Sequence, residues 1–236
     1  MTINGTKLSV RLLGATLALA TCGLLTGNAQ AQSRIYVSLN NNSIVSYDTS
    51  LTTAADVEAS KVVFTSTNLN FPRGLAFDSS GNLFAANQNN GTISKFDSTG
   101  VFQSTIGSGN LSAPYGLAFD SSGNLYAANA GDNTISKFDS TGSFQSTIGS
   151  GNLSFPYGLA IDSSGNLFAA NLVANTISKF DSTGSFLFSF NTPSGVTPFY
   201  LTIGGNPPAV PEPGAVAFGI IAAGSVLGLV ARKRRS

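Results

Sequence analysis

Short apolar runs of strand length alternate with polar turn residues through most of the chain. Gly116–Phe119, Asn124–Ala128, Thr134–Phe138 and Phe144–Ile148 are four such runs in succession. The sequences Asp-Ser-Ser-Gly-Asn and Asp-Ser-Thr-Gly separate them, and there Asp bonds the nearby backbone while Gly adopts a positive φ. The pattern predicts β-strands joined by tight hairpins.

This group of four strands is repeated. The segment Phe71–Gly100 returns twice with few changes, and the proline near its start recurs every 42 residues, at Pro72, Pro114 and Pro156. A period of about 40–50 residues with several short strands per unit is typical of a β-propeller blade. The predicted fold class is therefore all-β, a β-propeller.

Flanking segments complete the strand count. Arg34–Leu39 and Ser43–Asp48 align with the second and third strands of a unit. Lys61–Thr65 supplies a fourth strand, and Thr197–Ile203 resembles a first strand. About four four-stranded blades result, with Thr197–Ile203 predicted beside Arg34–Leu39 so that the ring closes and leaves no open edge. An open arc, or two chains completing a larger ring, is the alternative, and the inserted segment Thr49–Ser60 is predicted to project as a loop.

The units resemble NHL repeats. They share the order proline, glycine, an apolar pair, aspartate, Gly-Asn-Leu, and a later strand that ends in Phe-Asp. The likeness runs from about Arg34 to Ile203, inside a domain assigned to residues 32–204. The NHL pattern usually has arginine before the isoleucine of the third strand, whereas this chain has Thr92, Thr134 and Thr176 there. A basic binding face built from that arginine is therefore not expected.

The N-terminal segment, residues 1–31, has the features of a secretory signal peptide. A basic start and the apolar run Leu12–Leu25 precede an A-x-A cleavage site formed by Ala29 and Ala31, which makes Gln32 the first mature residue. Signal peptidase is thus an expected partner. The only cysteine, Cys22, lies in this segment, and a lipoprotein box around it is the alternative. Without Cys22 the mature domain has no disulfide and no cysteine metal site.

The C-terminal segment has three parts. Residues 205–214 form a Pro/Gly-rich linker that ends in the motif Val210, Pro211, Glu212, Pro213 and Gly214. Residues 215–231 are uncharged and apolar, and as a transmembrane helix they would span ~25 Å, marginally enough for a bilayer core. A basic tail follows in residues 232–236, with Arg232, Lys233, Arg234 and Arg235, which would stay cytoplasmic.

These three parts, in this order, resemble the PEP-CTERM sorting signal of Gram-negative surface proteins. The resemblance implies that exosortase, a membrane enzyme, recognises the Pro211-Glu212-Pro213 motif and removes the tail. The protein would be an inner-membrane-anchored precursor first, and would then reach the cell surface or extracellular matrix. A lasting single-pass anchor is the alternative.

Charge and composition exclude several function classes. Of the 12 Lys and Arg residues, six lie in residues 1–31 and 232–236, which leaves six against all 11 acids in residues 32–214 and a net charge of −5. A domain of that charge is not expected to bind nucleic acid. The chain has no histidine, so carboxylates are the only acid–base groups near neutral pH.

Most acids stand at repeated turn positions, so we expect no catalytic residue, no metal site and no cofactor. Asp78, Asp120 and Asp162, each with a following Asn, could hold calcium through oxygen ligands, and the alternative is a hairpin turn. Asn87, Asn129 and Asn171 end the second strands and are the candidate ligand-facing residues, with a turn or buried-backbone role as the alternative.

The sequence therefore favours an exported, non-enzymatic propeller that acts as a binding or structural protein of the surface or matrix. The association of PEP-CTERM tails with exopolysaccharide and biofilm implies an exopolysaccharide or a surface protein as partner. The alternative is an exported lyase- or lactonase-like enzyme that acts on a small ester, lactone or glycan. Such an enzyme would need a pocket that gathers two or more acids.

Overall fold

The computed structural model describes residues 10–12, 15–17, 34–193, 196–203 and 215–219. The chain divides into two units, Met1–Ala31 and Gln32–Ser236. The first unit holds a two-stranded antiparallel sheet of β1 (Val10–Leu12) and β2 (Ala15–Leu17). All other elements belong to the second unit, which contains four four-stranded sheets.

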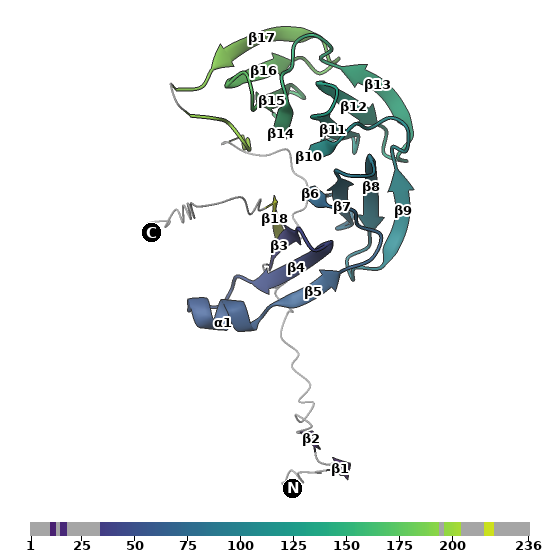
Figure 1. Ribbon diagram of the computed structural model, residues 1–236, viewed down its shortest axis with the longest axis vertical. Coiled ribbons are helices and arrows are strands. Elements are labelled where there is room, and N and C mark those ends of the chain that lie inside the picture. Colours follow the sequence, from purple (N-terminus) through teal and green to yellow (C-terminus); the bar gives the residue numbers. More distant parts are fainter. Residues whose placement is uncertain (1–9, 13–14, 18–33, 194–195, 204–214, 220–236) are drawn as a thin grey trace, which may run out of the picture. The chain divides into compact units, whose positions relative to one another are not determined.

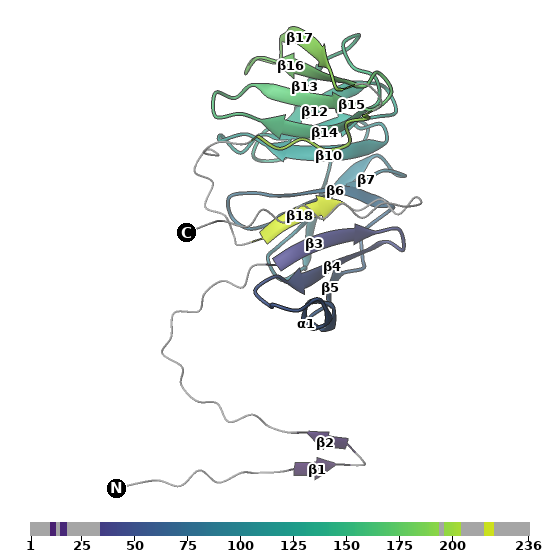
Figure 2. The ribbon, with the colours of Figure 1, turned by 90° about the vertical axis from the view of Figure 1, so that its left-hand side faces the viewer.

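Three of these sheets are antiparallel and follow the chain order (Figures 1 and 2). The second sheet holds β6 (Pro72–Phe77), β7 (Leu83–Asn87), β8 (Thr92–Phe96) and β9 (Phe102–Ile106). The third sheet holds β10 (Pro114–Phe119), β11 (Leu125–Asn129), β12 (Thr134–Phe138) and β13 (Phe144–Ile148). The fourth sheet holds β14 (Pro156–Ile161), β15 (Leu167–Asn171), β16 (Thr176–Phe180) and β17 (Phe186–Asn191). The predicted all-β repeat of four strands per unit is confirmed.

Hydrogen bonds within the turns explain why neighbouring strands of these sheets form hairpins. In the turn between β10 and β11, Asp120 Oδ1 accepts hydrogen bonds from the backbone N–H groups of Ser122 and Asn124, both at 2.9 Å. Asp120 Oδ2 accepts from Asn124 Nδ2 at 2.7 Å, and Gly123 has a φ of 80°. The turns at Asp78 and Asp162 repeat this arrangement. These aspartates therefore hold hairpin turns, which was the alternative to calcium ligation.

The first sheet has the order β18-β3-β4-β5. Its strands β3 (Arg34–Leu39), β4 (Ser43–Asp48) and β5 (Val62–Thr65) are antiparallel and lie at the predicted positions. The inserted segment contains a short helix, α1 (Ala54–Ala59), whose N-cap Thr53 accepts from the backbone N–H of Asp56. No residue of α1 is buried, so the predicted projecting loop contains a helical turn and a half.

The predicted closing strand is wrong. Thr197–Ile203 lies beside β14, where the ring of Tyr157 is 5.6 Å from that of Phe199 and 5.5 Å from that of Tyr200. The repeat explains this placement, because Pro198 follows Pro156 by the same 42 residues and stands where the innermost strand of a further unit would begin, although residues 196–203 form no strand. The described residues thus form an open series of sheets, one of the alternatives to closure.

The place beside β3 is taken by β18 (Ala215–Gly219), which runs parallel to β3 from Ala215 opposite Arg34 to Gly219 opposite Ser38. The helix predicted for residues 215–231 is therefore wrong for its first five residues, and residues 220–231 lie outside the described part. A strand forms because β3 has no first strand of its own unit to satisfy its backbone N–H and C=O groups. No helix among the described residues is long and apolar enough to cross a membrane.

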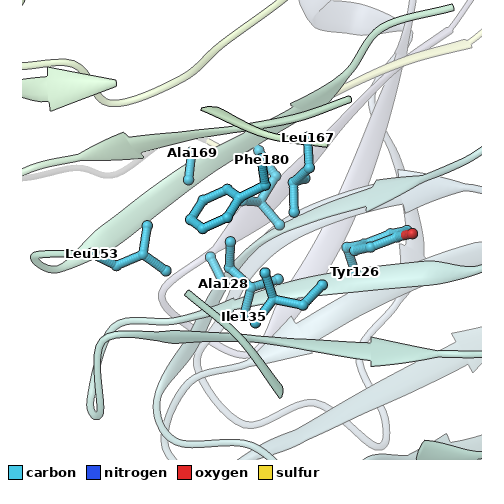
Figure 3. Packing of buried hydrophobic residues seen from close by; sticks show 9 residues of the cluster. Tyr126, Ala128, Ile135, Leu153, Leu167, Ala169 and Phe180 are labelled. Atoms are coloured by element: carbon cyan, nitrogen blue, oxygen red, sulfur yellow. The ribbon is translucent and has the colours of Figure 1, made fainter. Parts of the chain in front are cut away.

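The hydrophobic core lies between successive sheets. Between the third and fourth sheets, Tyr126, Ala128 and Ile135 pack with Leu167 and Phe180 (Figure 3). Phe180 is fully buried, as are Phe96 and Phe138 at the same position of the preceding units. The inner strands β6, β10 and β14 are direct neighbours, and this contact brings residues from different units together.

Candidate binding site

The three predicted ligand-facing asparagines lie inside the sheets. Asn87, Asn129 and Asn171 are 0%, 1% and 1% exposed. Asn129 Oδ1 accepts from the backbone N–H of Ser112 at 3.3 Å, and its Nδ2 donates to Thr134 Oγ1 at 3.0 Å and Ser136 Oγ at 2.8 Å.

Asn87 and Asn171 make the same set of bonds. Each amide therefore joins the second and third strands of its sheet to the segment that enters the first strand. The structure places these side chains in the buried-backbone role, which was the alternative to ligand contact.

The remaining residues that the sequence singled out lie outside the described part of the chain. They are Ala29, Ala31 and Gln32 at the predicted signal cleavage site, Val210, Pro211, Glu212, Pro213 and Gly214 of the sorting motif, and Arg232, Lys233, Arg234 and Arg235 of the basic tail.

A pocket between the second and third sheets contains two acids, Asp78 and Asp139. Asp139 Oδ1 accepts from the Thr141 hydroxyl, and this hydrogen bond is the main reason why the pKa of the carboxyl is lowered. Asp78 holds its own hairpin turn and lies 3.7 Å from Lys95 Nζ. Both acids thus serve as acceptors for neighbouring groups, and no cluster of three potential metal ligands occurs among the described residues.

Apart from the outer strand β17 of the fourth sheet and the residues after it, the differences between units gather at one edge of the sheets. The turns at Asp78 and Asp97 have nearly identical sequences in all three units, whereas the turn after β7 reads Gln-Asn-Asn-Gly, Ala-Gly-Asp-Asn and Leu-Val-Ala-Asn in successive units. The residue before the repeat proline also varies. Backbone bonds join these two variable segments, for example from Gln88 N–H to the Phe71 carbonyl at 3.2 Å. One edge is therefore nearly invariant, and the opposite edge carries the differences.

Side chains of the variable edge converge where the inner strands begin. Arg73, Tyr115, Tyr157 and Phe199 occupy the same repeat position, 42 residues apart. We call Phe71, Arg73, Tyr115, Tyr157 and Tyr200 the inner-strand cluster.

Its contacts run from one unit to the next. The guanidinium of Arg73 lies 4.2 Å from the ring centre of Phe71 and 5.3 Å from that of Tyr115. The rings of Tyr115 and Tyr157 are 4.5 Å apart, and Tyr157 then meets Tyr200. A cation and four aromatic rings thus form one continuous group, which comes from β6 and its entry, from β10, from β14 and from the segment 197–203.

The close approach of these strands depends on glycine. A Cβ at Gly116 would overlap the carbonyl oxygen of Tyr157, and one at Gly158 would lie 2.6 Å from the carbonyl oxygen of Phe199. Tyr200 stands at the corresponding position of the next unit, where the repeat no longer has glycine. Its side chain instead packs on Tyr157 and is 51% exposed.

The inner-strand cluster is rich in hydrogen-bond donors. Burial raises the pKa of the Tyr157 hydroxyl far above its usual value, and the neighbouring Tyr200 hydroxyl adds to the shift. Burial also raises the pKa of Tyr200, partly offset by Tyr157 and by the positive charge of Arg73. Both phenols are therefore protonated at neutral pH. The Tyr157 hydroxyl is buried and has no partner within hydrogen-bond geometry among the described residues.

Arg73 itself is positioned by a single side-chain hydrogen bond. Its Nε donates to Gln88 Oε1 at 2.6 Å. Within residues 34–193 and 196–203 no carboxylate forms an ion pair with it. The sequence contained a signal for this cluster, because Arg73 stands where later units have tyrosine, whereas the predicted fold depends only on the residues that the units share.

The chain matches no protein-family model and no curated protein. Solved structures do resemble it. Virginiamycin B lyase from Staphylococcus aureus with quinupristin has 17% identity and a TM-score of 0.55, over 68% of this chain and 52% of that one. A chain of a nidogen/laminin complex has 21% identity and a TM-score of 0.56, over 68% of this chain and 59% of that one.

The fold is that of a β-propeller. These neighbours are NHL- or YVTN-like propellers, and the chain spans about half their length. Their identities are low enough that the likeness shows the fold alone. One neighbour is a lyase and the other belongs to a nidogen/laminin complex, so this fold occurs both in an enzyme and in a protein–protein complex and does not by itself fix a function.

Proposed function

We propose that the protein is an exported, non-enzymatic propeller that binds a component of the cell surface or extracellular matrix. One observation carries this proposal. The units are nearly identical, but several of the side chains that differ between them meet in the inner-strand cluster. The second and third sheets differ chiefly at one edge, whereas the fourth sheet also differs in its outer strand β17, so the second and third sheets present a nearly uniform scaffold with one specialised edge. That edge holds a guanidinium, amides and phenols, which are groups suited to recognition.

Binding is favoured over catalysis because the described residues offer no group prepared for proton transfer. The chain has no histidine, and carboxylates such as Asp120 and Asp139 accept several hydrogen bonds within their turns. A lowered carboxyl pKa, as at Asp139, suits a permanent acceptor and not a general acid or base near neutral pH.

Export and sorting belong to the same proposal. Signal peptidase would cut after Ala31, and exosortase would act at the Val210–Gly214 motif of a PEP-CTERM signal. The partner outside the cell would be an exopolysaccharide or a surface protein. The support for this is the order of leader, propeller, motif, apolar segment and basic end along the sequence.

The intact mass of the protein recovered from the organism that makes it tests sorting directly. We expect a species that begins at Gln32 and ends between Val210 and Gly214. A species that still ends at Ser236 would refute processing and leave an anchored module. Replacing Glu212 by Gln should cause the precursor to accumulate, whereas replacing the exposed Glu58 by Gln should not.

Matrix binding is tested separately. The full gene, expressed in a strain from which it was deleted, should place the protein in the extracellular matrix fraction, and enzymatic removal of matrix polysaccharide should release it. Recovery of the protein only in the soluble medium, with intact matrix present, would refute the binding role.

A further inference from the structure

We propose that the inner-strand cluster binds the carboxylate of an acidic sugar, with Arg73 as the residue that pairs with it. This inference rests on the proposed function as a matrix-binding module and names the ligand class and the site. It follows from three features of the cluster: the unpaired cation, the surplus of donors, and the exposed polar and aromatic groups around them.

The first feature is the orientation of Arg73. Its Nε is used by Gln88, and the flanking rings of Phe71 and Tyr115 fix the plane of the guanidinium. The terminal nitrogens donate to no group among the described residues, although the side chain is half-buried. A guanidinium presents parallel N–H groups that match the two oxygens of a carboxylate. A fixed arginine without an acidic partner is thus prepared for an anionic ligand.

The second feature is the absence of competing negative charge. Tyr157 and Tyr200 stay protonated at neutral pH, and the Tyr157 hydroxyl lacks a partner within the described residues. Because the Tyr157 hydroxyl is buried, the donors left for a ligand are those of Arg73 and of the half-exposed Tyr200. The Tyr115 ring contacts both the guanidinium of Arg73 and the ring of Tyr157, at 5.3 Å and 4.5 Å, so the charge and the phenols belong to one continuous group.

The third feature separates a sugar from an acidic peptide. Tyr200 and Phe199 are 51% and 47% exposed and offer ring surface beside the donors. Asn89 and Asn90, in the turn after β7, expose amides that can both donate and accept. Sugar hydroxyls also do both, whereas an extended peptide brings backbone N–H groups that need a row of acceptors. The cluster provides donors mainly, which favours the sugar acid.

The experiment is isothermal titration calorimetry on the protein as its host secretes it. Trigalacturonate is the acidic probe, its fully methyl-esterified form is the neutral probe, and triglutamate is the peptide probe. We expect trigalacturonate to bind at least about tenfold more tightly than either of the others, with an affinity that falls as salt rises.

The variants use residues that the repeat itself supplies. Arg73→Tyr installs the residue of the next two units, and Gln88→Ala installs that of the third sheet, so both are compatible with the fold. Arg73→Tyr should weaken trigalacturonate binding by about 10- to 100-fold, because a charged hydrogen-bonded pair is lost. Gln88→Ala should weaken it less, since it only loosens the arginine. Lys61→Gln, which removes one exposed positive charge elsewhere, should leave binding unchanged, and circular dichroism verifies the fold of all three.

The outcomes separate this inference from the proposed function. Equal binding of trigalacturonate by Arg73→Tyr and the parent protein overturns the site, even if the protein still enters the matrix. Tighter binding of triglutamate overturns the ligand class in favour of an acidic peptide. If the parent protein fails to enter the matrix yet binds trigalacturonate through Arg73, the site stands and the matrix role falls.

Discussion

The buried asparagines give the sharpest test of how each blade is held together. In Asn129→Ala the side-chain amide disappears and three hydrogen bonds go with it. The Ser112 N–H loses its acceptor, which costs about 1–3 kcal/mol when the group is buried. Thr134 and Ser136 keep other hydrogen bonds, so each lost contact with them costs about 0.5–1 kcal/mol. We expect the free energy of unfolding to fall by about 2–5 kcal/mol.

Urea unfolding followed by circular dichroism measures this change, since the chain has no tryptophan. The matched control is Asn110→Ala, an exposed amide with one long contact of 3.5 Å to the Ser108 carbonyl, which should change stability by less than about 0.5 kcal/mol. Hydrogen exchange at the Ser112 amide adds a local reading and should accelerate in Asn129→Ala only. If both variants unfold at the same urea concentration and Ser112 keeps its protection, the assigned structural role of Asn129 is wrong.

Two further predictions concern the contact between blades and the turns. Gly116→Ala should destabilise the protein by about 3 kcal/mol, because the new methyl overlaps the Tyr157 carbonyl, whereas Gly109→Ala meets no atom within 4 Å and should cost about 1 kcal/mol for its φ of 82°. Similar melting temperatures for the two would contradict the close strand contact. At Asp139 the hydrogen bond from Thr141 lowers the carboxyl pKa below its unfolded value of about 3.9, so the stability that it contributes is present above about pH 5 and is lost as the pH falls through the folded pKa. Thermal unfolding at about pH 6 and pH 3 should therefore show a smaller loss for Asp139→Asn than for the parent protein, and an equal loss would refute the linkage.

Most strands were predictable because their determinants are local. Thr134–Phe138 and Phe144–Ile148 were predicted with the bounds that the structure has, since turn residues mark both ends of each strand. The period of 42 residues then gave the other units. Strand bounds and unit number depend on short-range turn chemistry, which a single sequence displays directly.

Ring closure was not predictable in the same way. The pattern of Thr197–Ile203 identifies it as a first strand but does not say which neighbour it joins. That choice depends on contacts between distant segments, such as the packing of the buried Phe138 and the close approach of the Phe199 carbonyl to Gly158. The inner-strand cluster was missed for a related reason, because Arg73 and Tyr157 are far apart in sequence and meet only once the inner strands are neighbours.

The nearly equivalent contacts between successive blades also bear on how such a chain changes over generations. At Gly74, Gly116 and Gly158 a backbone carbonyl of the next unit lies against the glycine in the same way. The contact between adjacent units is therefore nearly the same for each pair of units. Unequal recombination that inserts or deletes one whole period would rebuild every junction from residues that already fit. The length of the series is therefore expected to vary far more readily between related genes than the residues inside any one junction.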